Sequence, residues 1–104
     1  MKKAVRTHRL AEDELTHAGS WYETKQPGLG ASFLDRVDNT IERLRSGLLP
    51  STPVPNVKIV KNARRVLVNS FPYSIVFYER KDEIVIIAFA HSSRRPGYWL
   101  TREF

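Results

Sequence analysis

The segment from Ile84 to Ala90 limits the fold more than any other part of this sequence, because it is apolar at every position. Successive side chains of a strand point to opposite faces of a sheet, so a strand of this composition needs cover on both faces. Such a strand belongs in the middle of a sheet, with helices over one face and a shield over the other. The rest of the chain must therefore supply both neighbouring strands and covering layers.

Other segments are rich in Val, Ile, Phe and Tyr, which is typical of strands. Those that lead into EIVIIAFA (83–90) are VKIV (57–60), RRVLVNSF (64–71) and YSIVFYER (73–80). The short breaks between them are typical of antiparallel hairpins. Near the N-terminus, KKAVRTHRL alternates apolar and polar positions and predicts a short first strand.

The apolar period then changes to that of a helix. Ala11, Leu15, Ala18 and Tyr22 are separated by four, three and four residues, which predicts a helix from about Ala11 to Lys25. The QPGLG segment that follows breaks the pattern, because proline restricts its neighbours and glycine tolerates turn conformations. The chain is therefore expected to turn back after the first helix.

A second helix is predicted from Leu29 or Gly30 to Ser46, with Gly47 ending it. Its apolar stripe consists of Phe33, Val37, Ile41, Leu44 and Leu48, widened by Leu34. The segment LLPSTPVPN (48–56) has three prolines in nine residues and is predicted to be a loop.

The order strand, helix, helix and then strands is that of an α+β protein. We expect an N-terminal strand and a two-helix hairpin packed on a twisted, mainly antiparallel sheet of four to five strands. A chain of 104 residues suits one domain, so residues 1–104 are expected to form a single unit.

The net charge of the chain limits the classes of partner that it can bind. Seventeen Lys and Arg against eleven Asp and Glu give a net charge of +6, which suits nucleic acid, an acidic protein segment or an anionic membrane surface. The sequence lacks an apolar stretch of about 18 residues and an apolar segment after its basic start, so we expect a cytoplasmic protein that does not engage a membrane. It has no cysteine, and His8, His17 and His91 are not spaced as a metal site, so neither a metal nor a cofactor is expected.

The segment HSSRRPGYW after the apolar strand contains the candidate functional residues. His91 could titrate near neutral pH, Arg94 or Arg95 could hold an anion with two hydrogen bonds, and Tyr98 or Trp99 could stack on a base. Structural roles compete with these. His91 could donate a hydrogen bond to a backbone carbonyl, and the two aromatic residues are expected to anchor the C-terminal segment on the sheet.

The aromatic pair of the first helix has two interpretations as well. Trp21 and Tyr22 are adjacent and point in different directions, so Tyr22 joins the apolar stripe and Trp21 faces a flank. Core packing is the expected role of Trp21, whereas an exposed Trp21 would indicate a docking site. His8 and His17 are expected to be ordinary surface residues.

Three segments together resemble the RelE/ParE superfamily of toxins from bacterial toxin–antitoxin pairs. They are EDELTHAGSWYETKQPGLGASFLDRVDNTIERL, NSFPYSIVFYE and IIAFAHSSRRPGYW, and the resemblance covers nearly the whole chain. It implies a small basic toxin that forms a hetero-oligomer with a cognate antitoxin encoded beside it. An acidic, partly disordered antitoxin tail that folds on binding would suit a basic toxin.

The superfamily includes two activities. RelE-like members cut messenger RNA in the ribosome, whereas ParE-like members inhibit DNA gyrase without catalysis. Under the first alternative, His91, Arg94 and Tyr98 would be the catalytic residues, because cleavage needs proton transfer and a cation at the phosphate. RelE-like nucleases usually have arginines at the positions of Ser74 and Ser92, so the sequence favours the ParE-like side.

Arg64 and Arg65 could add charge to the same surface from the preceding strand. The residues expected to bind the target, nucleic acid or the antitoxin are Arg64, Arg65, His91, Arg94, Arg95, Tyr98 and Trp99. A third alternative is a non-toxic nucleic-acid-binding module, although the chain has no helix-turn-helix signature, no RNP-like strand and no Gly-rich clamp.

Overall fold

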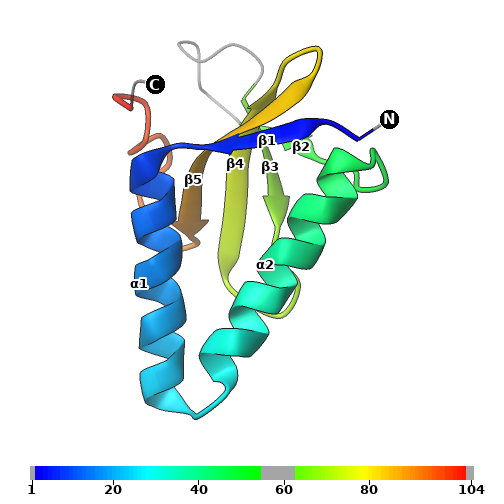
Figure 1. Cartoon of the computed structure of the whole chain (residues 1–104). Helices are drawn as coiled ribbons and strands as arrows, with labels where there is room; N and C mark the ends of the chain where they lie inside the picture. The colour runs from blue at the N-terminus through cyan, green and yellow to red at the C-terminus, as the bar shows by residue number, and fades with distance from the viewer. Residues whose placement is uncertain (1, 55–62, 103–104) are drawn as a thin grey trace.

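The computed structural model describes residues 2–54 and 63–102. Its elements are β1 (Ala4–Thr7), α1 (Arg9–Lys25), α2 (Leu29–Arg45), β2 (Thr52–Pro53), β3 (Arg64–Leu67), β4 (Tyr73–Glu79) and β5 (Glu83–His91). The strands form one five-stranded sheet in the order β1-β5-β4-β3-β2. The two helices form a hairpin that covers one face of this sheet (Figure 1). This arrangement confirms the predicted α+β class.

The apolar strand β5 lies inside the sheet, as its composition predicts. It pairs in parallel with β1, where Val5 lies opposite Ile84, and antiparallel with β4, where Ile75 lies opposite Phe89. The remaining pairs, β4 with β3 and β3 with β2, are antiparallel. The helical hairpin and three strands separate β1 from β5 in the sequence, in keeping with the long connection that a parallel pair needs.

One extra residue in β5 changes which side chains face the helices. Val76 pairs with Ala88 and Phe77 pairs with Ile86, so Ile87 is an additional residue opposite β4. A bulge of this kind interrupts the alternation of a strand. Ile86 and Phe89 therefore both belong to the core under the helices, whereas Ile87 and Ala88 belong to the opposite core. The strand beyond the bulge turns His91, which pairs with Tyr73, toward the helix side.

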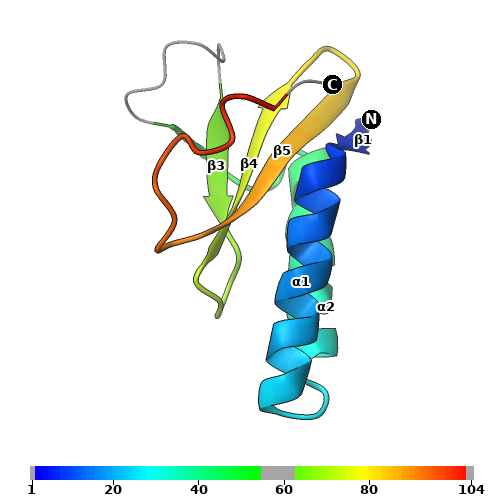
Figure 2. The same cartoon turned by 90° about the vertical axis from the view of Figure 1, so that its left-hand side faces the viewer.

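Two cores cover the two faces of the sheet. Under the helices, the largest buried side chains include Phe33, Phe77 and Ile75. On the other face, the C-terminal segment runs across the strands (Figure 2) and inserts Trp99, which is 3% exposed, beside Val76. The expected role of Trp99 as an anchor of the C-terminal segment is confirmed.

The helix boundaries differ slightly from the prediction. Helix α1 begins at Arg9, two residues before the predicted start, because the Nδ1 atom of His8 accepts a hydrogen bond from the Leu10 N–H at 3.0 Å. This side-chain cap satisfies a donor that a helix start leaves unpaired. His8 is 9% exposed, so the expectation that it is an ordinary surface residue is wrong. Helix α2 ends at Arg45, one residue before the predicted Ser46.

The Pro-rich segment also departs from the prediction in part. Thr52 and Pro53 form the short strand β2 within the predicted loop 48–56, pairing with Arg65 and Arg64. Proline is tolerated at the edge of a sheet, where its missing N–H is not needed by a neighbour. The strand predicted at 57–60 lies outside the described residues.

Strand β3 ends at Leu67, earlier than the predicted 64–71. The chain then turns through Ser70, whose φ of 72° is left-handed, and the Val68 N–H donates to the Tyr73 carbonyl at the start of β4. Among the described residues, no helix combines the length and apolar character that crossing a membrane requires.

The turn between the helices depends on two glycines and one carboxylate. Gly28 caps α2 with a φ of 87°, and Glu23 accepts hydrogen bonds from the Gly28 and Gly30 N–H groups at 2.9 and 3.0 Å. Gly30 lies against α1, where an added Cβ would come within 2.5 Å of the Gly19 carbonyl oxygen. The missing side chain at Gly30 therefore lets the helices approach closely.

We predict that Gly30→Ala lowers the free energy of unfolding by about 1–3 kcal/mol, the usual cost of overpacking. Gly19→Ala is the matched control, because its Cβ would lie 3.6 Å from the Leu34 side chain, an ordinary contact. In the control, alanine is expected to be neutral or to stabilise the helix by up to about 1 kcal/mol. Urea denaturation of both variants measures the difference, and equal losses would contradict the close approach at Gly30.

Candidate functional site

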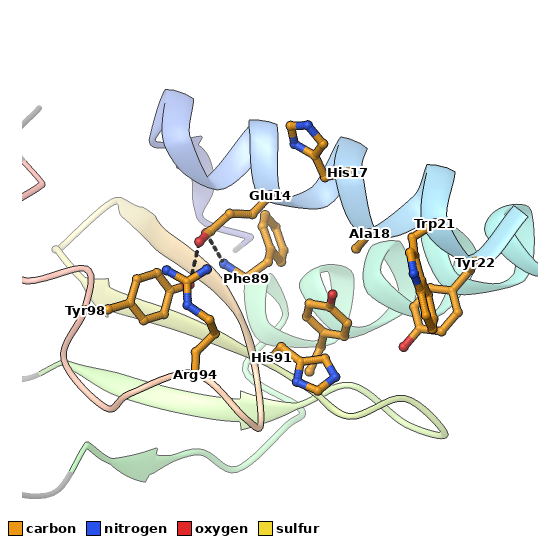
Figure 3. Close-up of a pocket in the computed structure, with 10 residues that line it drawn as sticks. Glu14, His17, Ala18, Trp21, Tyr22, Phe89, His91, Arg94 and Tyr98 are labelled. Atoms are coloured by element: carbon orange, nitrogen blue, oxygen red, sulfur yellow. Dashed lines mark hydrogen bonds between the residues drawn. The ribbon is translucent and has the colours of Figure 1, made fainter. Parts of the chain in front are cut away.

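A groove of about 510 Å³ lies between α1 and the end of β5, closed at one side by the C-terminal segment (Figure 3). Its walls come from three parts of the chain that are distant in sequence. The lining residues are Glu14, His17, Ala18, Trp21, Tyr22, Tyr73, Phe89, His91, Arg94 and Tyr98.

The floor of the groove is aromatic and well packed. Tyr22 of α1 packs against Phe33 of α2 and Tyr73 of β4, with ring centroids 5.1 and 6.3 Å apart respectively. Tyr73 in turn meets the His91 ring edge to face at 5.1 Å. Rings in such contacts have little freedom to move, so the floor is preformed rather than created by a ligand.

Trp21 lies at the rim of this groove and is 56% exposed, so its expected core packing is wrong. The physical reason is its adjacency to Tyr22, because neighbouring helix positions differ by about 100° and only Tyr22 reaches the core. Trp21 instead contacts Tyr22 edge to face at 5.1 Å, and Lys25 Nζ lies 4.9 Å from its ring. An exposed indole held in this way is typical of a docking site.

Glu14 organises the other end of the groove. Its Oε1 accepts hydrogen bonds from the Phe89 N–H at 3.1 Å and from Arg102 at 2.8 Å. Its Oε2 accepts hydrogen bonds from the Tyr98 hydroxyl at 2.5 Å and from Arg102 at 2.8 Å. The Glu14–Arg102 pair is shielded, with side chains 17% and 10% exposed. One carboxylate therefore joins α1, β5 and the C-terminal segment.

The protonation of this cluster follows from its contacts. Burial alone would raise the pKa of the Glu14 carboxyl, but the hydrogen bonds from Arg102 and Tyr98 outweigh it and lower that pKa below its ordinary value. Burial and the hydrogen bond to Glu14 raise the pKa of Tyr98 well above that of a free phenol. At neutral pH, Glu14 is thus ionised and Tyr98 is a protonated donor.

Arg94 and His91 supply polar groups to the groove. The Arg94 guanidinium lies 3.9 Å from the centre of the Tyr98 ring, within the range of a cation–π contact. The Nδ1 atom of His91 accepts a hydrogen bond from the Ser93 N–H at 3.0 Å, so a neutral His91 has its proton on Nε2. His91 therefore accepts from the backbone, whereas the sequence suggested that it donates.

The structure brings together only part of the predicted binding set. His91, Arg94 and Tyr98 line the groove, whereas the other members lie elsewhere. The members outside the groove are Arg64, Arg65, Arg95 and Trp99. Arg95 is exposed on the turn after β5, and Trp99 is buried on the opposite face.

The two arginines of β3 point to opposite faces of the sheet. Arg64 pairs with Phe77 of the helix-side core, and Arg65 pairs with Val76 of the other core. The Arg64 guanidinium also donates to Ser51, with its Nε atom 2.6 Å from the hydroxyl oxygen. They therefore do not add charge to the groove.

Sequence reasoning missed Glu14 and Arg102. A signal for Glu14 was present, because it lies three residues after Ala11 and four before Ala18, beside the apolar stripe of the first helix. A carboxylate at such a position requires a partner that compensates its burial. The sequence around Glu14 did not indicate which residue would be its partner, because Arg102 is 88 residues away.

We predict that Glu14→Gln lowers the free energy of unfolding at pH 7 by about 2 kcal/mol, because it leaves the shielded Arg102 without its counter-charge. The native stabilisation is complete above the pKa of glutamate in an unfolded chain, about 4.3, and is lost as pH falls through the lower folded pKa. The difference between wild type and variant should therefore shrink in acid.

Glu42→Gln, which removes a largely exposed partner of Lys2, is the control and should change stability far less. Denaturation curves from pH 7 to pH 3 test this, and a difference that grows in acid would contradict it.

Comparison with known proteins gives the chain a family. A profile described as the ParE toxin of the type II toxin–antitoxin system parDE matches residues 5–96. Proteins named Toxin ParE2 from two strains of Mycobacterium tuberculosis, CDC 1551 / Oshkosh and H37Rv, are each 25% identical to this chain over 97 residues, covering 93% of it and 89% of the relative.

A solved structure has the same fold. It is described as the chromosomal ParDE TA system from P. aeruginosa, and it superposes with a TM-score of 0.70 at 16% identity, covering 86% of this chain and 96% of the other. The family match spans the helical hairpin, β3, β4, β5 and the start of the C-terminal segment. The chain therefore belongs to the ParE toxin family of type II toxin–antitoxin systems.

Proposed function

We propose that this toxin inhibits DNA gyrase in the cytoplasm by binding it, and that a cognate antitoxin neutralises it. The observation that carries the proposal is the groove itself, which offers cationic and donor groups over an aromatic floor. Such a surface can hold a protein segment without performing a reaction. The net charge of +6 agrees with an anionic or acidic partner.

The polar groups of the groove favour binding over RNA cleavage. Cleavage through a 2′-hydroxyl needs a group that accepts a proton near neutral pH and another that donates one. A neutral His91 has its proton on Nε2, because its Nδ1 accepts from the Ser93 N–H. The Tyr98 hydroxyl donates to Glu14, and the pKa of Tyr98 is raised. Ser74 and Ser92 stand where RelE-like nucleases usually have arginines. These features support the ParE-like alternative over a RelE-like enzyme that acts on the ribosome and mRNA.

We further propose that the antitoxin covers the groove in a toxin–antitoxin hetero-oligomer. Trp21 is the largest exposed aromatic side chain at the rim, and Tyr22 and Lys25 restrain it. Restrained aromatic side chains lose little entropy on binding and often dominate interface energetics. A segment with an apolar ridge would pack on this side of the groove.

Expression of the toxin alone in bacteria should arrest growth, and purified protein should inhibit the supercoiling of relaxed plasmid by purified gyrase. Messages translated during the arrest should remain intact when their 5′ ends are mapped. Co-expression of the small protein encoded beside the toxin should restore growth. Cuts at codon positions would instead support the RelE-like alternative, and normal growth with abundant folded protein would overturn the toxin proposal.

The role of Trp21 can be tested on the same pair of proteins. Trp21→Ala should weaken antitoxin affinity by roughly 30-fold, which corresponds to about 2 kcal/mol for a truncated hot spot. Leu48→Ala is the matched control, because Leu48 is 69% exposed and lies outside the groove. Isothermal titration calorimetry measures both affinities, and equal affinities for the two variants would place the antitoxin on another surface.

A further inference from the structure

Arg94 is a cation without a counter-ion in the described structure. It is exposed, lines the groove, and forms no ion pair with any residue in the ranges 2–54 and 63–102. Its side chain is nevertheless held in place, because the guanidinium stacks on the Tyr98 ring at 3.9 Å. A guanidinium stacked by one face keeps its N–H donors free along its edge.

The nearby Glu14 carboxylate does not compensate the charge of Arg94, because it is already paired with Arg102. Glu14 receives two hydrogen bonds from Arg102 and one each from Tyr98 and Phe89, which occupies both of its oxygens. Arg102 itself also donates to the Ile87 carbonyl at 2.9 Å. Within residues 2–54 and 63–102, the positive charge at Arg94 is therefore without a paired carboxylate.

The same ion pair fixes the ring on which Arg94 rests. The hydrogen bond from Tyr98 to Glu14 sets the direction of the phenol, and Arg102 lies 5.1 Å from the centre of the same ring. The family match ends at residue 96, before both Tyr98 and Arg102.

We infer that Arg94 is a carboxylate-binding subsite of the groove, that it receives an acidic side chain of the antitoxin segment, and that Glu14 positions it through Tyr98. The inference rests on the proposed function for the identity of the partner. The edge of a planar guanidinium can donate two hydrogen bonds to one carboxylate. The His91 ring lines the same groove. The aromatic floor adds a preference for an acidic side chain that is followed by an apolar one.

Small probes test the subsite on the free protein. The probes are 3-phenylpropionate, its neutral amide, and phenyl phosphate, each titrated while nuclear magnetic resonance follows the Trp21 indole N–H and the Arg94 Nε–H. The carboxylate should bind at least fivefold more tightly than the amide, and at least as tightly as the phosphate. Arg94→Gln should abolish the difference between carboxylate and amide. Arg95→Gln, which removes an exposed neighbouring charge outside the groove, should preserve it.

The positioning role of Glu14 has a separate readout. At 3.9 Å, the ring of Tyr98 should shift the resonances of the Arg94 side-chain protons. Glu14→Gln should reduce this shift by at least half and the preference for the carboxylate by at least threefold. Tyr98→Phe keeps the ring and removes its hydroxyl, so it tests the same link without changing the charge. Glu12→Gln removes an exposed carboxylate from the same helix and should change neither quantity.

Several results would overturn the inference. Equal binding of carboxylate and amide, absence of binding by either, or an unchanged preference in Arg94→Gln would exclude the subsite. Tighter binding of phenyl phosphate would assign the groove to a nucleic acid instead of an acidic peptide. An unchanged Arg94 shift in both Glu14→Gln and Tyr98→Phe would remove the positioning role. None of these measurements depends on toxicity, so a failure of the proposed function in the growth assay is distinguishable.

Discussion

The ion pair between Glu14 and Arg102 joins parts of the chain that otherwise belong to opposite sides of the sheet. Helix α1 covers one face, and the C-terminal segment covers the other with Trp99. At the edge beyond β1, the Phe89 N–H donates to Glu14 and the Ile87 carbonyl accepts from Arg102. A sheet edge exposes such groups to unwanted pairing with other chains. The ion pair satisfies two of them and closes one wall of the groove.

The extra residue in β5 determines which side chains enter that groove. A regular strand would continue its alternation past Ile86 and turn Phe89 and His91 away from the helices. The bulge at Ile87 reverses this, so the strand buries Ala88 against Trp99 and still presents His91 beside Tyr73. One irregularity in the hydrogen-bonding ladder thus serves both cores and the groove.

The helices and most strands were predictable because each follows from local periodicity. The stripe through Ala11 and Tyr22 and the wholly apolar 84–90 segment required no knowledge of distant contacts. The errors arose where tertiary structure decides. His8, directly after β1, caps α1 with its side chain. Pro53 pairs with Arg64 in the short strand β2, which lies at the end of the described strand order. Helical spacing separated Tyr22 in the stripe from Trp21 on a flank, but only the packing around α1 decides that this flank stays exposed.

The candidate site was harder to predict, because its residues come from elements whose order in space is not apparent in the sequence. The HSSRRPGYW segment pointed to His91, Arg94 and Tyr98, but composition alone could not separate them from Arg95 on the same turn. Glu14 illustrates the same limit. Its position beside an apolar stripe signals a buried partner, whereas the choice of Arg102 depends on how the C-terminal segment returns across the sheet.

The balance of charges around the groove has a kinetic consequence for binding of the proposed acidic antitoxin segment. A net charge of +6 raises the rate at which an acidic partner arrives, and this steering weakens with salt. Steering alone gives no specificity, because seventeen basic residues attract any anion. Arg94 is held on the Tyr98 ring at 3.9 Å and lines the groove beside its preformed aromatic floor. Since Arg102 neutralises Glu14, the carboxylate of the groove does not repel an acidic segment. In the proposed complex, long-range attraction would set the rate of arrival, and the fixed contacts in the groove would set the lifetime of the complex.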